Sequence, residues 1–118
     1  MNAQHLKERT KQFALRVMRL VDVLPNTPKG RAIASQLVRS GTSVAANYRA
    51  ACRGRSKAEF IAKLGVVVEE ADETVFWLEV LTETGVISAT KAANLQKEAN
   101  ELLAIFSASL RTSKRGFQ

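Results

Sequence analysis

The sequence predicts an all-α protein, an antiparallel up-down-up-down four-helix bundle that forms one domain over residues 1–118. Four segments repeat their apolar residues every three or four positions, which is the spacing of one face of an α-helix. Both prolines lie in the short run from Pro25 to Pro28, so the rest of the chain contains no proline to break a helix. No segment shows the alternating pattern of a strand bounded by turns. The connections are short, and short connections favour antiparallel neighbours.

The first predicted helix covers residues 5–24. Pro25 ends it, and Pro28 keeps the following loop from returning to a helix too early. The apolar residues that recur on one face of this helix are Leu6, Phe13, Val17, Leu20 and Leu24.

The second predicted helix, residues 29–53, carries an apolar seam and an arginine stripe on opposite sides. At 100° per residue, Arg31, Arg39, Arg49 and Arg53 fall within about 80° of arc. Gly41 costs about 1 kcal/mol of helix propensity relative to alanine. It indicates a kink, a close approach of two backbones, or a small residue tolerated in a tightly packed helix. The seam comprises Ile33, Ala34, Leu37, Gly41, Val44, Tyr48 and Cys52.

The third predicted helix covers residues 57–84. Ser56 and Glu59 form a capping-box pattern at its start, and Gly85 supplies the left-handed residue that ends it. Its main seam contains Phe60, Leu64, Val67, Ala71, Val75 and Leu78. Four further apolar residues lie away from this seam and predict an interface with another subunit, the alternative being packing within the same chain: Val66, Phe76, Trp77 and Val80.

The fourth predicted helix covers residues 89–112, and its three-four repeat includes Ala92, Leu95, Ala99, Leu102 and Phe106. The tail that follows, residues 114–118, is short and basic, and we expect it to be mobile.

The formal charge of +7 arises within one window, residues 23–58, which contains seven basic residues and no acidic one. Outside this window, eleven basic and eleven acidic residues cancel. A concentrated positive field indicates a polyanionic partner, and nucleic acid is the natural candidate. The predicted nucleic-acid-binding residues are Arg31, Arg39, Arg49, Arg53, Arg55 and Lys57.

The acidic third helix offers an alternative use for these cations. Residues 69–83 contain six acids and no base, so the arginines could instead form ion pairs within the chain or between subunits. In that case the protein is a structural oligomer.

The composition argues against several other classes of function. A single cysteine, Cys52, excludes an intrachain disulfide and favours the cytosol. No apolar run approaches the ~20 residues that span a bilayer, and the N-terminus has no signal-peptide core. Because His5 is the only histidine, no metal set is predicted. No catalytic triad, phosphate-binding loop or acid–base pair appears, so we expect a protein without cofactor or enzymatic activity.

Two runs carry a resemblance to a known family. The run from Arg39 to Arg49 and the run from Glu69 to Thr74, with Trp77–Leu78–Glu79, resemble the proteins named for the intervening sequences of bacterial 23S ribosomal RNA genes. The resemblance covers about residues 13–110. It implies an antiparallel four-helix bundle, often a ring of five subunits with a basic surface. It also implies kinship with the accessory proteins of diversity-generating retroelements, which act beside a reverse transcriptase and its RNA. Ala50 stands where the family usually has an acid.

These observations together predict a cytoplasmic, non-enzymatic homo-oligomer, expected as a pentamer, that binds RNA or DNA non-specifically and has no membrane partner. The alternative is a protein–protein adaptor or scaffold, whose basic face docks an acidic partner such as a reverse transcriptase.

Overall fold

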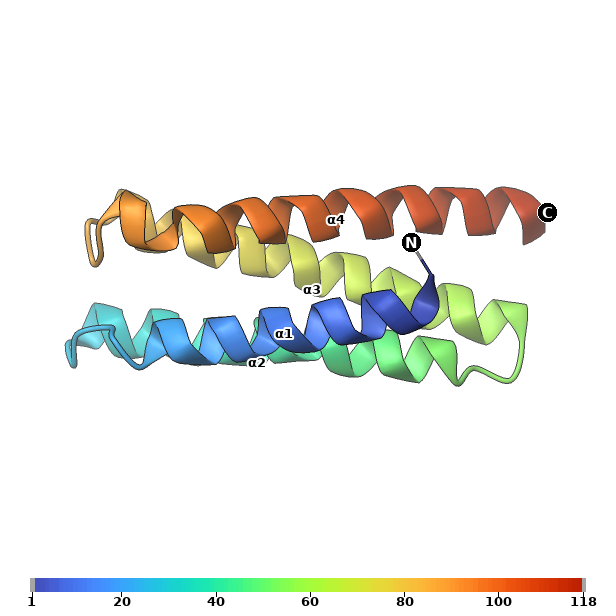
Figure 1. Cartoon of the computed structure of the whole chain (residues 1–118), viewed down its shortest axis with the longest axis horizontal. Coiled ribbons are helices and arrows are strands. Elements are labelled where there is room, and N and C mark those ends of the chain that lie inside the picture. The colour runs from blue at the N-terminus through green and yellow to red at the C-terminus, as the bar shows by residue number, and fades with distance from the viewer. Residues whose placement is uncertain (1, 118) are drawn as a thin grey trace.

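Four α-helices joined by three short loops make up the protein in a computed structural model, which describes residues 2–117. The helices are α1 Ala3–Val21, α2 Pro28–Cys52, α3 Lys57–Glu83 and α4 Ala89–Phe117, and none of the described residues forms a strand. The predicted all-α four-helix bundle is therefore confirmed. The chain turns back at each loop, so that both termini and the α2–α3 loop lie at the same end of the bundle (Figure 1).

Prolines and a threonine fix the boundary between α1 and α2. α1 ends at Val21 rather than at Leu24, because a residue that precedes a proline is disfavoured in the helical conformation. Pro28 is the first residue of α2, where a missing N–H leaves no helical hydrogen bond unmade. The Thr27 side-chain oxygen caps this turn by accepting a hydrogen bond at 3.1 Å from the amide three residues further on.

The structure confirms the predicted Ser56 cap at the start of α3 and the predicted Gly85 stop at its end. The Ser56 hydroxyl oxygen accepts a hydrogen bond from the amide of Glu59 at 3.1 Å, which satisfies one of the free donors of the first turn. Gly85 adopts φ = 74°, a left-handed conformation that costs glycine little and that ends the helix.

The fourth helix is longer than the predicted range 89–112, because α4 continues to Phe117. The mobility predicted for residues 114–118 stays a prediction, and residue 118 lies outside the described residues. The end of α4 contains no proline, and Ser113 is buried, so the last turns are packed against the bundle. Its basic residues also suit the negative end of the helix dipole. As a result, Arg111, Lys114 and Arg115 stand on regular helix at the end of the bundle that holds the termini.

The apolar seams of the four helices meet in one core. Gly41 marks a close approach of α1 and α2, since a Cβ at this position would stand about 3.0 Å from both γ-methyl carbons of Val17. Across the core, the rings of Tyr48 on α2 and Phe106 on α4 have centroids 5.0 Å apart. In the described part of the chain, no helix is both long enough and apolar enough to cross a membrane. The large side chains that are fully buried include Phe13, Leu37, Leu64, Leu78, Leu81, Leu102 and Phe106.

Candidate nucleic-acid interface

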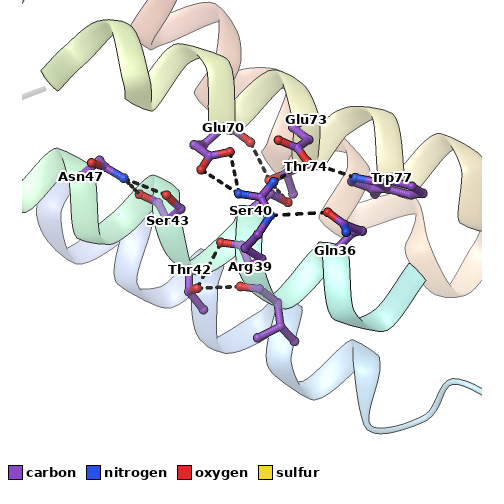
Figure 2. A network of polar contacts seen from close by, with 11 residues as sticks. Gln36, Arg39, Ser40, Thr42, Ser43, Asn47, Glu70, Glu73, Thr74 and Trp77 are labelled. Atoms are coloured by element: carbon purple, nitrogen blue, oxygen red, sulfur yellow. Dashed lines mark hydrogen bonds and ion pairs between the residues drawn. The ribbon is translucent and has the colours of Figure 1, made fainter. Parts of the chain in front are cut away.

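Arg39, in the middle of α2, is held by two carboxylates of α3 (Figure 2). Its Nη1 donates to both carboxylate oxygens of Glu70, at 3.0 and 3.3 Å, and its Nη2 pairs with Oε1 of Glu73. Glu73 also accepts a hydrogen bond from the indole N–H of Trp77 at 3.4 Å. The hydrogen bond from Arg39 lowers the pKa of Glu73 below its usual range. The charge of Arg39 is therefore balanced within the chain, as the ion-pair alternative predicts for this residue.

Neutral polar side chains near Arg39 form hydrogen bonds either between α2 and α3 or within α2. The buried hydroxyls of Ser40 and Thr74 lie 2.9 Å apart and share a hydrogen bond between the two helices (Figure 2). Asn47 donates to the backbone carbonyl of Ser43 at 2.9 Å and to its hydroxyl oxygen at 2.7 Å. This polar layer holds the helices together, and its donors are used within the protein.

The rest of the arginine stripe is exposed, but it does not form one site. Arg31 lies at the start of α2 and donates to the side-chain oxygen of Asn26 at 2.9 Å. Arg49 and Arg53 lie in the last turn and at the C-cap of the same helix. At 1.5 Å per residue, Arg31 and Arg53 are about 33 Å apart along the helix. A short ligand cannot contact both ends of this stripe.

The topology instead gathers cations toward the end of the bundle that holds both termini (Figure 1). The first turns of α1 and α3, the last turns of α2 and α4, and the α2–α3 loop all contribute to it. Nine of the ten side chains are exposed and Lys7 is half-buried. We call this set the basic end: Lys7, Lys11, Arg49, Arg53, Arg55, Lys57, Lys63, Arg111, Lys114 and Arg115.

The charge of the protein is divided between this end and the remainder. Residues 3–11, 49–63 and 111–117 contain eleven basic residues and two acidic ones, a net charge of +9. The rest of the sequence contains seven basic and nine acidic residues, a net charge of −2. Two of those acids, Glu98 and Glu101, pair with Arg9, and counting them with this end gives it a charge of +7 and leaves the remainder neutral. Arg9 is the eleventh basic residue and has carboxylate partners, whereas the ten residues of the basic end have none within 4.0 Å among the described residues. The positive field is therefore concentrated at one end of the molecule.

The structure thus divides the six residues predicted to bind nucleic acid. Arg49, Arg53, Arg55 and Lys57 belong to the basic end, whereas Arg31 lies at the other end of α2 and Arg39 is paired. Six members of the basic end are not among the predicted residues. In the sum of charges along the sequence, acidic residues cancel their charge, but the fold places most of those acids elsewhere. In an up-and-down bundle, the starts of the first and third helices lie beside the ends of the second and fourth. Basic residues in these four segments could have been grouped on that ground, and the six are Lys7, Lys11, Lys63, Arg111, Lys114 and Arg115.

Arg9 connects α1 to α4. Its Nε and Nη2 donate to the two carboxylate oxygens of Glu98, both at 2.7 Å, and Nη2 also lies 3.5 Å from Glu101. The side chains of Arg9 and Glu98 are only 19% and 16% exposed, so little solvent screens this pair. The hydrogen bond from Arg9 lowers the pKa of Glu98 below its usual range.

This pair predicts a loss of stability in acid. Because the pKa of Glu98 is lower in the folded than in the unfolded state, its contribution is complete above the unfolded value of about 4.3 and disappears as the pH falls through the folded value. We expect Glu98→Gln to be less stable at pH 7 by about 1–3 kcal/mol, because it weakens a charged hydrogen bond. Thermal melts from pH 7 to pH 3 should show a smaller acid-induced loss in this variant than in the wild type. Equal losses would contradict the role of the pair.

The predicted subunit interface is only partly covered by the chain itself. Phe76 is 51% exposed and contacts the ring of Trp77 edge-on, with centroids 5.0 Å apart. Trp77 and Val80 are partly buried against the core, and Val66 is half-buried. Packing within the chain accounts for much of Trp77 and Val80 but leaves half of Phe76 open to solvent.

The described residues do not form a metal site, and the single cysteine is partly buried. Cys52 is half-buried at the end of α2, and burial raises the pKa of its neighbour Tyr48. In the part of the chain that the structure describes, no three His, Cys, Asp or Glu residues are grouped so that they could hold a metal ion.

A family model and a solved structure are similar to this chain over nearly its whole length. The model of the 23S rRNA-intervening sequence protein matches residues 4–108. The solved structure, from Bacteroides thetaiotaomicron, is a protein of unknown function from the S23 ribosomal protein family. It is 32% identical, has a TM-score of 0.85, and the alignment covers 94% of this chain and 99% of that chain. No curated protein matches.

Proposed function

This chain belongs to the 23S rRNA-intervening sequence protein family, and we propose that it is a non-enzymatic, cytoplasmic protein that binds RNA or DNA through its basic end. The observation that carries this proposal is the group of ten cations that have no carboxylate partner among the described residues. Cations without partners are free to replace the counterions that surround a phosphate backbone, and the release of those counterions drives binding.

The chemistry of the cluster favours phosphate over the edges of bases. Five of its ten residues are arginines, whose planar forks donate two parallel hydrogen bonds to a phosphate. The others are lysines, which act as flexible point charges. The cations are spread over four helices and one loop rather than over one helix aligned for a groove. Binding through phosphates fixes position but carries no sequence information, so the proposed binding is non-specific.

The proposal includes self-association, expected as a pentamer, through the face that carries Val66, Phe76, Trp77 and Val80. The half-exposed ring of Phe76 supports it, because large aromatic side chains are favoured at subunit contacts. An assembly of identical subunits would multiply the number of basic ends that face one polyanion.

The dependence of affinity on salt tests the proposed function. We expect the full chain to bind mixed-sequence RNA and duplex DNA, with a log–log slope of affinity against salt near −3 to −4 per subunit if about four cations contact phosphates. Fluorescence anisotropy between 50 and 200 mM salt measures this slope. Absence of binding at 50 mM salt, or a flat response to salt, would contradict phosphate contact and favour the adaptor alternative, in which the basic end docks an acidic protein.

A further inference from the structure

We infer that the ligand of the basic end is a nucleic-acid double helix rather than a single strand. The inference deepens the proposed function and rests on it. Three observations carry it: the density of charge at this end, the helical backbone on which most of the cations stand, and the absence of an open aromatic surface beside them among the side chains that the structure describes.

The first observation compares charge densities. The bundle measures 22 × 19 Å across its two shorter axes. A duplex crossing about 20 Å presents about 12 phosphate charges, because it carries one charge per ~1.7 Å, whereas a single strand at ~3.4 Å per charge presents about six. Ten unpaired cations at one end of the bundle favour the more densely charged of these two polyanions.

The second observation concerns how the cations are held. Apart from Arg53 at the C-cap of α2 and Arg55 in the α2–α3 loop, they stand on regular helix, including the last turns of α4. Lys7 and Lys11 of α1 line the same shallow hollow as Arg49 of α2, so cations of two helices are adjacent. Because most of these residues are held on helical backbone, their spacing suits the regular phosphates of a duplex. A single strand would have to give up conformational freedom to match the array.

The third observation is that, among the side chains that the structure describes, no aromatic face is open for base stacking near these cations; the side chain of Phe117 lies outside that set. Tyr48 is buried, and Phe60 is half-buried with the Nζ of Lys57 over its ring at 6.0 Å from the centroid. Proteins that bind single strands gain about 1–3 kcal/mol for each base stacked on an aromatic side chain. The exposed ring of Phe76 lies instead on the acidic part of α3.

The hollow at the basic end is lined by polar and charged side chains only. It is lined by Gln4, Lys7, Glu8, Lys11 and Arg49 and has a volume of about 180 Å³. Pockets that hold organic ligands typically measure ~300–1,000 Å³. The interaction that this surface offers is therefore directed to phosphates, which a duplex presents at twice the density of a single strand.

The test compares strands of identical length. Fluorescence anisotropy of the full chain measures binding to a 20-base-pair RNA duplex, a 20-base-pair DNA duplex and their separate unstructured strands at 50, 100 and 200 mM salt. We expect both duplexes to bind at least about tenfold more tightly than the single strands at 100 mM salt, with a steeper slope, because about two more phosphates are contacted.

A pair of variants on one helix locates the contact. Arg111→Ala/Lys114→Ala removes two cations of the basic end and should weaken duplex binding by about tenfold or more. Lys91→Ala/Lys97→Ala removes two exposed cations near the opposite end of α4 and should change it less than about twofold. An equal loss in both variants would overturn the placement at the basic end.

The outcomes separate this inference from the proposed function. Single strands that bind as tightly as duplexes, with the same slope, would overturn the inference and leave nucleic-acid binding in place. Absence of binding to all four probes at 50 mM salt would overturn the proposed function itself.

Discussion

Replacing Arg49 and Arg53 together by glutamate is expected to lower the affinity for nucleic acid by about a hundredfold at 0.1 M salt. Each phosphate contact contributes about 0.9 of a decade at this salt concentration relative to 1 M, and the two new carboxylates repel the backbone as well. The net charge of residues 3–11, 49–63 and 111–117 falls from +9 to +5. Neither arginine has an ion-pair partner among the described residues, so we expect the fold to persist.

The matched control reverses two cations at the other end of the same helix. Lys29→Glu/Arg31→Glu produces the same change in net charge, and both side chains are exposed. Because these residues begin α2, about 27 Å from Arg49 at 1.5 Å per residue, we expect less than a threefold loss of affinity. Equal losses in both variants would show that the whole arginine stripe binds, as the helix-face reading of the sequence predicts. Light scattering checks that Arg49→Glu/Arg53→Glu keeps the size of the wild type, since a smaller particle would place these arginines at a subunit contact.

The helices could be predicted from the sequence because their signals are local. The proline pair at 25 and 28, the Ser56 cap and Gly85 each act on the backbone within a few residues, and the predicted boundaries at these points lie within three residues of the observed ones. The end of α4 was missed because its last turns are polar and carry no strong apolar repeat. Their order depends on the rest of the bundle, against which Ser113 is buried, and no local signal reports that contact.

The candidate site could be predicted only in part, because which charges neutralise one another depends on their positions in the folded structure and not on their order in the sequence. Arg39 is offset by Glu70 and Glu73, which lie more than thirty residues away in sequence and one helix away in space. A sum of charges along the sequence gives no reason to select Lys7 and Lys11, because acidic residues elsewhere in the chain cancel their charge. Six of the eleven acids lie in residues 69–83 of α3, away from the basic end. The net charge of a sequence therefore indicates a polyanionic partner, whereas the order of the helices decides where that partner is met.

Truncating Phe106 to alanine is expected to lower the free energy of unfolding by about 3–5 kcal/mol. Its side chain is fully buried, and its ring contacts Tyr48 across the core at a centroid distance of 5.0 Å, so the truncation removes contacts between α4 and α2. A loss of this size is a large part of the ~5–15 kcal/mol that stabilises a typical domain. Urea denaturation followed by circular dichroism measures it.

Phe76→Ala is the matched control, because it makes the same chemical change at an aromatic side chain that is 51% exposed. We expect it to cost less than about 1.5 kcal/mol, since half of that ring is already in water. Comparable losses in the two variants, measured at a protein concentration at which the size of the particle is known, would indicate that Phe76 is buried by another subunit. A loss below about 1 kcal/mol for Phe106→Ala would contradict the core packing that holds the last turns of α4, and with it the position of Arg111, Lys114 and Arg115 at the basic end.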